Sequence, residues 1–397
     1  MQVYEQNHMT RNLLMALMLC LSLWGCARQE TPEDQPVGVM MAAERLDAYL
    51  PMLKGKQVGL CVNHSAIVGQ VHLLDTLMAL GIDVEKVFTP EHGFTGSADA
   101  GEKVDYEGAK QTFELVSLYG ENKKPTPEQM QGLDVMIYDI QDVGARFYTY
   151  ISTMTYLMEA CAEANLPLIV LDRPNPNGGY VDGPVLDTAY RSFVGMHPVP
   201  IVHGLTSGEF AQLINGEGWL VGRATCDLTV VKCDRWTHAQ PYSLPLKPSP
   251  NLPDDQSIAL YPSLCLFEQT MFSVGRGTDR AFQHLGHPDY PDTTYYFIPQ
   301  SREGATNPLF KGQKCFGLDY ATDPIQYRFT VQPLIDLYQA METESFFKPY
   351  FHRLAGNKTL QTQIEQGLSE AEIRQSWEPA LSEFKNLRAK YLLYPED

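Results

Sequence analysis

The stretch Gln57–Ser65, QVGLCVNHS, decides the fold, because an apolar run there stops abruptly at polar side chains. The same pattern recurs in VEKVFTPEHGF (Val84–Phe94), DVMIYDIQD (Asp134–Asp142) and LIVLDRPN (Leu168–Asn175). In an open parallel sheet, ligands bind in the crevice beyond the carboxyl ends of the strands. We therefore expect several of these strand endings to face one cleft, which indicates an active site.

Helical patterns lie between the strand-like runs. Apolar residues recur at helical spacing over Val71–Leu80 and Phe147–Ala164. Thr206 and Glu209 have the spacing of a capping box, which opens a helix to about Asn215. Alternating strands and helices imply right-handed crossovers and a parallel sheet. The sequence thus predicts an α/β, Rossmann-like first domain.

Several common motifs are missing from the sequence. No GxGxxG loop follows the first strand, and no P-loop signature occurs, so we expect no nucleotide and no other cofactor. HExxH and GxSxG are also absent, which argues against a zinc protease and an α/β-hydrolase. No metal site is predicted. Paired carboxylates remain as the candidate chemistry.

A proline-rich segment divides the chain. Tyr242–Asp255 contains KPSPNLP and is typical of a domain junction. We place the Rossmann-like domain at residues 39–245, and a smaller mixed α+β domain that closes the cleft at residues 246–397. In this second domain, we expect strands near Tyr295–Pro299, Gln313–Leu318 and Gln326–Thr330, and helices over Pro333–Met341 and about Ser369–Tyr391.

Length and charge narrow the class of protein. The 397 residues are 44% hydrophobic, which is enough for two domains with substantial cores. The net charge of -18 and the pI near 4.9 argue against nucleic-acid binding, since that function needs clustered Lys and Arg. No feature of the sequence bears on the oligomeric state.

The N-terminal region predicts a location. Leu13–Leu23 is apolar but too short to span a bilayer, and it ends at LWGC. This segment resembles a bacterial lipoprotein signal with Cys26 as the lipidated residue, although Trp24 is bulky for that motif. We expect a signal peptide at residues 1–25, a polar tether at 26–38, and a membrane lipoprotein anchored by lipid in the periplasm of a bacterial cell envelope. A plain cleaved signal or a buried segment is the alternative.

The six cysteines beyond Cys26 show no CxxC spacing. Most lie in apolar runs, so we expect buried thiols rather than a metal site or a disulfide framework. Cys226 and Cys233 flank a strand-like run and could pair.

Glu91 is the leading candidate for chemistry, because it lies in the turn after a strand beside Pro90, His92 and Gly93. An apolar surrounding would keep such a carboxyl protonated at neutral pH, as a general acid requires. Capping the next helix or pairing with an Arg is the alternative role.

Other polar residues follow the later strands. Asp139 and Asp142 offer a second carboxylate with Arg146 as a partner, although Asp142 equally suits a helix cap near Arg146. The loop DRPNPNGG (Asp172–Gly179) presents Arg173, Asn175 and Asn177 to a sugar or a carboxylate, or is an ordinary turn.

Two further segments carry candidate residues. His203 suits either a ligand contact or a buried core, and Glu209 suits a helix cap better than a site. Glu268 and Arg276 lie in loop-like surroundings, and glycines on both sides of Arg276 indicate close backbone packing or close approach of a ligand.

Several motifs follow one another along the chain. In order, they are TPEHGF (Thr89–Phe94), DVGARFYTY (Asp142–Tyr150), DRPNPNGG, PSPN (Pro248–Asn251), and Phe267–Glu268 with SVGRGT (Ser273–Thr278). Together they resemble the NamZ-type exo-β-N-acetylmuramidases, formerly a domain of unknown function, over about residues 40–395. The resemblance implies a Rossmann-like catalytic domain, a smaller C-terminal domain, and Glu91 as the catalytic acid. It also implies release of terminal N-acetylmuramic acid from the non-reducing ends of peptidoglycan fragments.

The predicted catalytic residues are Glu91, Asp139 and Glu268. The predicted substrate-binding residues are Asn63, His92, Asp142, Arg146, Tyr148, Arg173, Asn175, Asn177, His203, Asn251 and Arg276. The lactyl carboxylate of the substrate needs a cation, for which Arg146, Arg173 and Arg276 are candidates.

The mechanism is left open by the sequence. Retaining and inverting glycosidases differ in the separation of two carboxyl groups, ~5 Å against ~6.5–9.5 Å. Alternatively, the 2-acetamido group of the sugar serves as an internal nucleophile, and Asp139 or Glu268 orients it.

We therefore predict an exo-acting glycoside hydrolase in cell-wall turnover. A non-catalytic muropeptide-binding lipoprotein is the first alternative, and a hydrolase of an ester or amide in the same material is the second.

Overall fold

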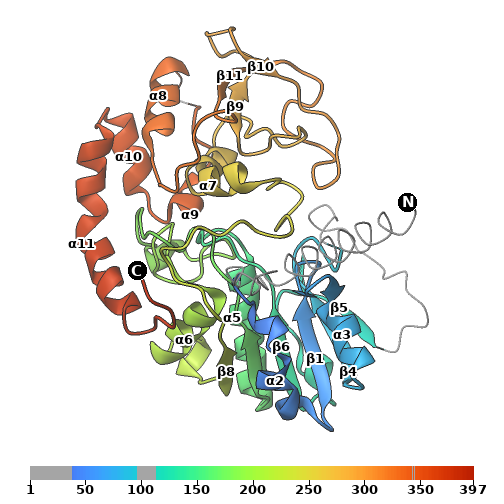
Figure 1. The fold of residues 1–397 in the computed structure, drawn as a ribbon. Coiled ribbons are helices and arrows are strands. Elements are labelled where there is room, and N and C mark those ends of the chain that lie inside the picture. Colours follow the sequence, from blue (N-terminus) through green and yellow to red (C-terminus); the bar gives the residue numbers. More distant parts are fainter. Residues whose placement is uncertain (1–37, 96–112, 342, 344) are drawn as a thin grey trace, which may run out of the picture. The chain divides into compact units, whose positions relative to one another are not determined.

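The computed structural model describes residues 38–95, 113–341, 343 and 345–397. Val39–Asp397 forms one compact unit, in which an α/β domain is followed by a smaller domain (Figure 1). The predicted signal peptide, Cys26 and nearly all of the predicted tether lie outside the described residues. None of the helices in the described part of the chain is long and apolar enough to cross a membrane.

Six parallel strands form the sheet of the first domain, in the order β5-β4-β1-β6-β7-β8. The strand order reverses between β1 and β6, as in a doubly wound Rossmann-like domain, so the predicted fold class is confirmed. The strands are β1 (Gln57–Val62), β4 (Asp83–Thr89), β5 (Glu114–Ser117), β6 (Val135–Asp139), β7 (Leu168–Leu171) and β8 (Leu228–Val231).

Helices cover both faces of this sheet. On β1, the Cys61 side chain packs in the core with α5 and α6, whereas Leu60 and Val62 pack in the core with α2 and α3. Successive strand side chains point to opposite faces, and burial on both faces explains the continuous apolar runs in the sequence. These helices are α2 (Leu46–Leu53), α3 (Leu73–Ala79), α5 (Tyr150–Ala164) and α6 (Ser207–Gly216).

The helix predicted from Val71 begins later, at Leu73. The reason is that β3 (Val71–His72) pairs with β2 (Ile67–Val68) in a small hairpin. In contrast, α6 begins after Thr206 with the predicted capping box, so the structural role of Glu209 is confirmed.

The helix predicted from Phe147 also begins later, at Tyr150. The preceding residues form turns, in which the Tyr148 N–H donates to the Ala145 carbonyl at 2.8 Å. A helix cap at Asp142 is therefore wrong: its Oδ1 accepts a hydrogen bond from the Gly144 N–H at 2.7 Å instead.

The second domain combines a three-stranded antiparallel sheet, β10-β11-β9, with helices, which confirms a mixed α+β region. Its strands are β9 (His284–His287), β10 (Tyr296–Phe297) and β11 (Cys315–Asp319). Its helices are α7 (Asp255–Leu264), η4 (Cys265–Gln269), α8 (Gln332–Met341), α9 (Phe351–Ala355), α10 (Thr359–Glu365) and α11 (Glu370–Arg388).

Two local predictions in this domain are wrong. Gln326–Thr330 forms no strand, and Thr330 binds neighbouring helices, with its N–H donating to Ser263 and its hydroxyl to Glu370. The segment before Glu268 is helical rather than loop-like, because α7 continues through Pro262 into η4.

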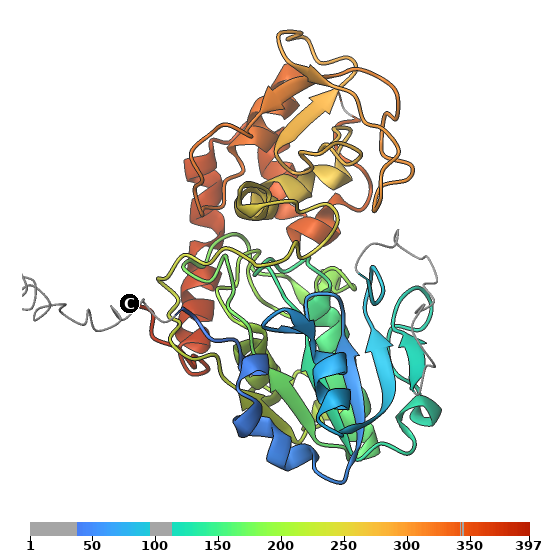
Figure 2. The same ribbon diagram turned by 45° about the vertical axis from the view of Figure 1, so that its right-hand side comes forward.

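The C-terminal segment ties the two domains together. Helix α11 runs along both domains in Figures 1 and 2. Near its end, the Arg388 guanidinium donates two hydrogen bonds to the Gly204 carbonyl, at 3.1 and 2.8 Å. Beyond it, the Tyr394 hydroxyl donates to Asp172 at 2.6 Å. The tail of the chain thus returns to the first domain.

All six described cysteines are buried and free, which confirms the predicted thiols and rules out a bond between Cys226 and Cys233 in this structure. Short elements complete the described fold: η1 (Ala42–Glu44), α4 (Pro127–Met130), η2 (Thr188–Tyr190) and η3 (Val221–Arg223).

Candidate active site

A cavity of about 160 Å³ lies between the two domains. One wall comes from the loop after β4 and the segment that leads into α5. The other wall comes from α7, η4 and the loop that follows them. The structure brings together five of the predicted site residues in this pocket: Glu91, His92, Tyr148, Glu268 and Arg276.

A larger cavity, of about 490 Å³, lies between α4 and the end of α5. Its charged lining residues are Glu128 and Glu163, and Glu163 is already paired with Lys124 at 2.7 Å. The smaller pocket therefore offers more chemistry, because it combines two carboxylates with a guanidinium.

Glu91 is half-buried, in the turn that follows β4. The Thr149 hydroxyl donates to its Oε2 at 2.8 Å, and the Tyr119 hydroxyl also hydrogen-bonds to this carboxylate. Burial and the nearby Glu91 charge raise the pKa of Tyr119 to about 12, so the phenol remains a donor at neutral pH. Among the described residues, no Lys or Arg forms an ion pair with Glu91.

The backbone beside Glu91 is unusual. His92 and Gly93 both adopt left-handed conformations, each with φ of 70°. For a residue other than glycine this conformation is uncommon, and such strain is concentrated at functional sites. The turn is closed by a hydrogen bond from the Gly93 N–H to the Pro90 carbonyl at 3.0 Å, which constrains the backbone at Glu91.

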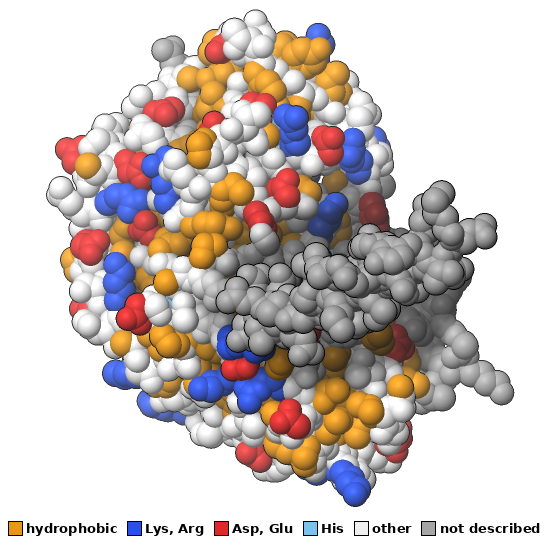
Figure 3. Space-filling model, in the orientation of Figure 1, with side chains coloured by type: hydrophobic (Ala, Val, Ile, Leu, Met, Phe, Trp, Pro, Cys, Tyr) orange, Lys and Arg blue, Asp and Glu red, His pale blue; other side chains and the backbone are white. Residues whose placement is uncertain are grey.

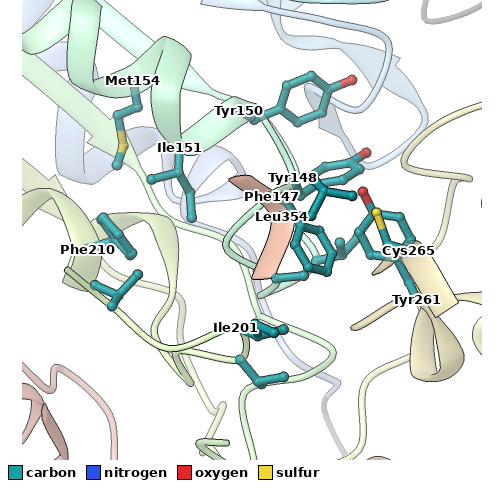
Figure 4. Packing of buried hydrophobic residues seen from close by; sticks show 14 of the residues in the cluster. Phe147, Tyr148, Tyr150, Ile151, Met154, Ile201, Phe210, Tyr261, Cys265 and Leu354 are labelled. Carbon is teal, nitrogen blue, oxygen red and sulfur yellow. The ribbon is translucent and has the colours of Figure 1, made fainter. Parts of the chain in front are cut away.

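Aromatic rings form much of the pocket wall. Tyr148 packs edge-on against Tyr150 and Tyr261, with ring centroids 4.8 and 5.9 Å apart. Figure 4 shows the hydroxyls of these three tyrosines on the same side of the cluster. The Tyr148 hydroxyl donates to the Pro248 carbonyl at 2.8 Å, which holds the ring in place. Flat apolar faces rimmed by hydroxyls suit a sugar ring.

Glu268 and Arg276 belong to the wall that the second domain supplies. The Arg276 Nε donates to Glu268 Oε1 at 2.5 Å, and the Cys265 thiol lies 3.6 Å from Oε2. Burial by itself would lower the pKa of Arg276, but the Glu268 carboxylate outweighs it and raises the pKa. The guanidinium also lies 5.1 Å from the centre of the Phe282 ring. Its position is therefore set by an ion pair and a cation–π contact.

The glycines beside Arg276 are required by close packing. This was one of two explanations predicted from the sequence, the other being close approach of a ligand. A Cβ at Gly275 would lie 2.1 Å from the His284 ring, and one at Gly277 would lie 2.5 Å from the Gln300 carbonyl oxygen. Both glycines also have positive φ. The loop that carries Arg276 is thus held rigidly.

Asp139 and Arg173 lie outside the pocket lining and bind each other. Both are almost fully buried, and Arg173 makes a bidentate ion pair with Asp139, in which the Nη2–Oδ2 distance is 2.9 Å. The pair joins the ends of β6 and β7. Both carboxylate oxygens of Asp139 are therefore bound by Arg173 and are not free for catalysis. Neither residue belongs to the proposed site.

We predict that Asp139→Asn destabilises the fold by roughly 3–5 kcal/mol, because it leaves a buried guanidinium without its counter-charge. Urea unfolding monitored by circular dichroism measures the loss. Asp234→Asn is the matched control, since its ion pair with Arg235 is solvent-exposed and should contribute little. Equal effects of the two substitutions would contradict this assignment.

Three other predicted binding residues are engaged in contacts outside the pocket lining, and the Asn177 amide also donates to the Ile258 carbonyl of α7 at 3.2 Å. The amide of Asn175 donates to the Leu205 carbonyl at 2.9 Å, and that of Asn177 donates to the Val143 carbonyl at 2.8 Å. His203 is buried, and burial lowers its pKa to about 3, so its ring is neutral. These contacts support loops around the pocket and do not face a ligand in it.

Asn63, Asp142 and Asn251 are also buried beside the pocket rather than lining it. Asn63 Oδ1 accepts hydrogen bonds from the backbone and hydroxyl of Ser65. Asn251 donates to the Gly304 carbonyl at 2.9 Å. Burial raises the pKa of Asp142 to about 7, against the lowering effect of its hydrogen bond from Gly144.

Arg146 does not line the pocket either. Its guanidinium is buried and donates to backbone carbonyls, so it is not free to bind a substrate carboxylate. Of the three arginines proposed for that role, only Arg276 lines the pocket.

Sequence reasoning missed Thr149 and Tyr261 as pocket residues, and Tyr119 as a hydrogen-bond partner of Glu91. Thr149 lies within the DVGARFYTY motif, so the motif itself was a usable signal. Tyr119 and Tyr261 reach the site from distant parts of the chain, and no local pattern marks them.

No metal centre is found among the described residues. No group of three His, Cys, Asp or Glu side chains gathers in the described part of the chain in a way that could hold a metal ion. On the visible described surface in Figure 3, acidic and basic side chains are interspersed. The chemistry available in the pocket is therefore that of carboxylates, hydroxyls and a guanidinium.

Two carboxylates that line one aromatic pocket from different domains suit the glycoside hydrolases, which commonly use two Asp or Glu residues. Comparison with known proteins agrees with this class. The family models described as exo-beta-N-acetylmuramidase NamZ, N-terminal and C-terminal, match residues 58–256 and 259–394. The chain therefore belongs to the NamZ family.

One relative is the peptidoglycan beta-N-acetylmuramidase NamZ of Bacillus subtilis (strain 168). It is 38% identical over 375 residues, which cover 88% of this chain and 89% of the relative.

Two crystal structures of DUF1343 family proteins from Bacteroides fragilis NCTC 9343 share the fold. One has a TM-score of 0.84 and 43% identity, and the match covers 91% of this chain and 100% of the chain in that crystal structure. The other has a TM-score of 0.78 and 27% identity, and the match covers 90% of this chain and 99% of the chain in that crystal structure.

Proposed function

We propose that this protein is an exo-acting β-N-acetylmuramidase. It releases terminal, non-reducing N-acetylmuramic acid from peptidoglycan fragments during cell-wall turnover and recycling. Family membership supports the reaction class. The observation that carries the proposal is the pocket itself, which is lined by Glu91 from the first domain, by Glu268 and Arg276 from the second, and by aromatic rings. The small volume of the cavity suits a terminal sugar better than an internal segment of a long glycan.

In this proposal, Glu91 protonates the glycosidic oxygen as the bond to the next sugar breaks. The Thr149 hydroxyl binds one carboxyl oxygen, Oε2, and so sets the orientation of the carboxyl plane. The tight turn around His92 keeps the group at a fixed place in the pocket. Pre-organisation of this kind lowers the cost of reaching the reactive geometry.

We propose that the acetamido oxygen of the substrate attacks the anomeric carbon. Both oxygens of Glu268 already have partners, Arg276 on Oε1 and the Cys265 thiol on Oε2, which makes this carboxylate a poor nucleophile. Glu268 is better placed to orient the acetamido N–H. Water then opens the resulting bicyclic intermediate, so the anomeric configuration is retained.

Product analysis tests the reaction type. The muramidase frees a new sugar reducing end, whereas an ester or amide hydrolase acting on the same material would free an acid or an amine. Detection of the latter products without a new reducing end would contradict the proposal.

We also propose a periplasmic, lipid-anchored location. The support is the apolar run Leu13–Leu23 followed by Cys26, which the sequence places before a polar tether. Cys26→Ser should shift the protein from the membrane fraction to the soluble periplasmic fraction and abolish incorporation of labelled palmitate. Cys61→Ser is the control, because that thiol is buried in the fold. Unchanged membrane association of Cys26→Ser would contradict the anchor.

A further inference from the structure

Arg146 makes an unusual set of contacts. Its Nη1 donates to the carbonyls of Pro184 and Val199, at 2.7 and 2.9 Å. Its Nη2 donates to the carbonyls of Leu354 and Ala355, at 2.8 and 2.9 Å. One guanidinium therefore binds two carbonyls of the first domain and two of the second.

No carboxylate within the described residues shares this contact. Arg146 is 3% exposed, and burial lowers its pKa to about 9, so it remains charged at neutral pH. Its charge is met by carbonyl dipoles, including those at the C-terminal end of α9, where a cation is favourable. Gly356 ends that helix, and a Cβ there would lie 2.6 Å from Nη2. The helix end is thus shaped around the guanidinium.

On both sides of the Arg146 contact, residues next to it in the chain or taking part in it also line the pocket. On the first-domain side, Arg146 precedes Phe147–Tyr150, all of which line the pocket, and Thr149 binds the Glu91 carboxylate. On the second-domain side, Leu354 supplies a bound carbonyl and lines the pocket with its side chain. Figure 4 shows Leu354 next to Phe147. A shift at Arg146 would therefore change the spacing of the two walls.

We propose that Arg146 is a positioning residue that fixes the wall carrying Glu91 and Thr149 in register with the wall carrying Leu354. The inference rests on the proposed function, because it matters for turnover only if the glycosidic bond is cleaved in this pocket. Arg146 acts through its neighbours and does not touch the substrate.

The test is Arg146→Lys in the purified protein, assayed with a disaccharide of N-acetylmuramic acid β-linked to N-acetylglucosamine. A lysine keeps the charge but cannot span four carbonyls with one planar group. We expect kcat to fall roughly 10- to 100-fold, the effect of a displacement of about 1 Å in an active site. KM should change much less, and circular dichroism should show a folded protein.

Arg388→Lys is the matched control. Arg388 is also buried and also donates to a carbonyl of the first domain, with Glu396 as an ion-pair partner, but none of its hydrogen bonds within the described residues reaches a pocket residue. The Arg388→Lys substitution should lower the melting temperature. It should leave kcat unchanged at temperatures where both Arg388→Lys and Arg146→Lys are folded. Gly356→Ala, which crowds Nη2 from the other side, should lower kcat as Arg146→Lys does and covers the case in which Arg146→Lys does not fold.

Wild-type kcat in Arg146→Lys or Gly356→Ala, or equal losses of kcat in Arg146→Lys and Arg388→Lys, would overturn the inference. These outcomes can be separated from failure of the proposed function. If Glu91→Gln is inactive while Arg146→Lys has wild-type kcat, only the role of Arg146 is wrong. If Glu91→Gln keeps full turnover, the proposed active site itself is wrong.

Discussion

Glu91→Gln should reduce kcat on a muramic acid–glucosamine disaccharide by about 1,000-fold or more, which is within the range that general acid catalysis contributes. Gln keeps the shape of the side chain and its hydrogen bond from Thr149, but it cannot transfer a proton. The loss should be much smaller on a para-nitrophenyl muramide, because nitrophenolate leaves readily without protonation. A loss that depends on the leaving group is the signature of a general acid.

Affinity should behave differently from turnover. Because the substitution preserves shape, Glu91→Gln should bind the disaccharide nearly as tightly as the wild type in calorimetry. Glu85→Gln, on the same strand β4 but outside the pocket lining, is the control and should be fully active. Equal losses of kcat on the two substrates would show that Glu91 does not act as the acid.

Arg276→Met should remove the preference for muramic acid over glucosamine. The two sugars differ in the lactyl group, and its carboxylate needs a cation. Arg276 binds Glu268 through Nε, and its Nη atoms make no hydrogen bond to other described residues. A charge-assisted hydrogen bond contributes about 1.5–3 kcal/mol, so kcat/KM on the muramide should fall roughly 10- to 100-fold.

The ratio of the two substrates is the informative quantity. Loss of Arg276 also frees Glu268, but this effect is common to the para-nitrophenyl muramide and the corresponding glucosaminide and cancels in the ratio of kcat/KM. Arg280→Met is the matched control, because Arg280 pairs with Asp319 at 3.4 Å and does not line the pocket. An unchanged ratio in Arg276→Met would assign recognition of the lactyl group to another residue.

The central strands could be predicted because burial on both faces makes them continuous apolar runs. Strand β1 is found at Gln57–Val62, where the sequence placed it. Strand β5 was not predicted, since Glu114–Ser117 is a short edge strand with a half-exposed pattern. Helix α7 was mistaken for a loop because Pro262, normally a helix breaker, lies inside it.

The site was predicted in part, for a physical reason. Glu91, Glu268 and Arg276 lie in motifs whose glycines and prolines fix a backbone conformation, and the fold brings them to one pocket. Asp139 follows a strand in the same way, yet its neighbour across the sheet, Arg173, neutralises it. Which polar strand endings bind each other and which face a cavity depends on tertiary contacts that one sequence does not display.

The most direct measurement of the central claim is mass spectrometry of the products from two glycans that differ only at the non-reducing end. One begins with N-acetylmuramic acid, and the other carries an additional N-acetylglucosamine before it. An exo-acting muramidase should release free N-acetylmuramic acid from the first glycan and leave the second intact. Cleavage inside the second glycan, or no cleavage of either by the folded protein, would contradict the account.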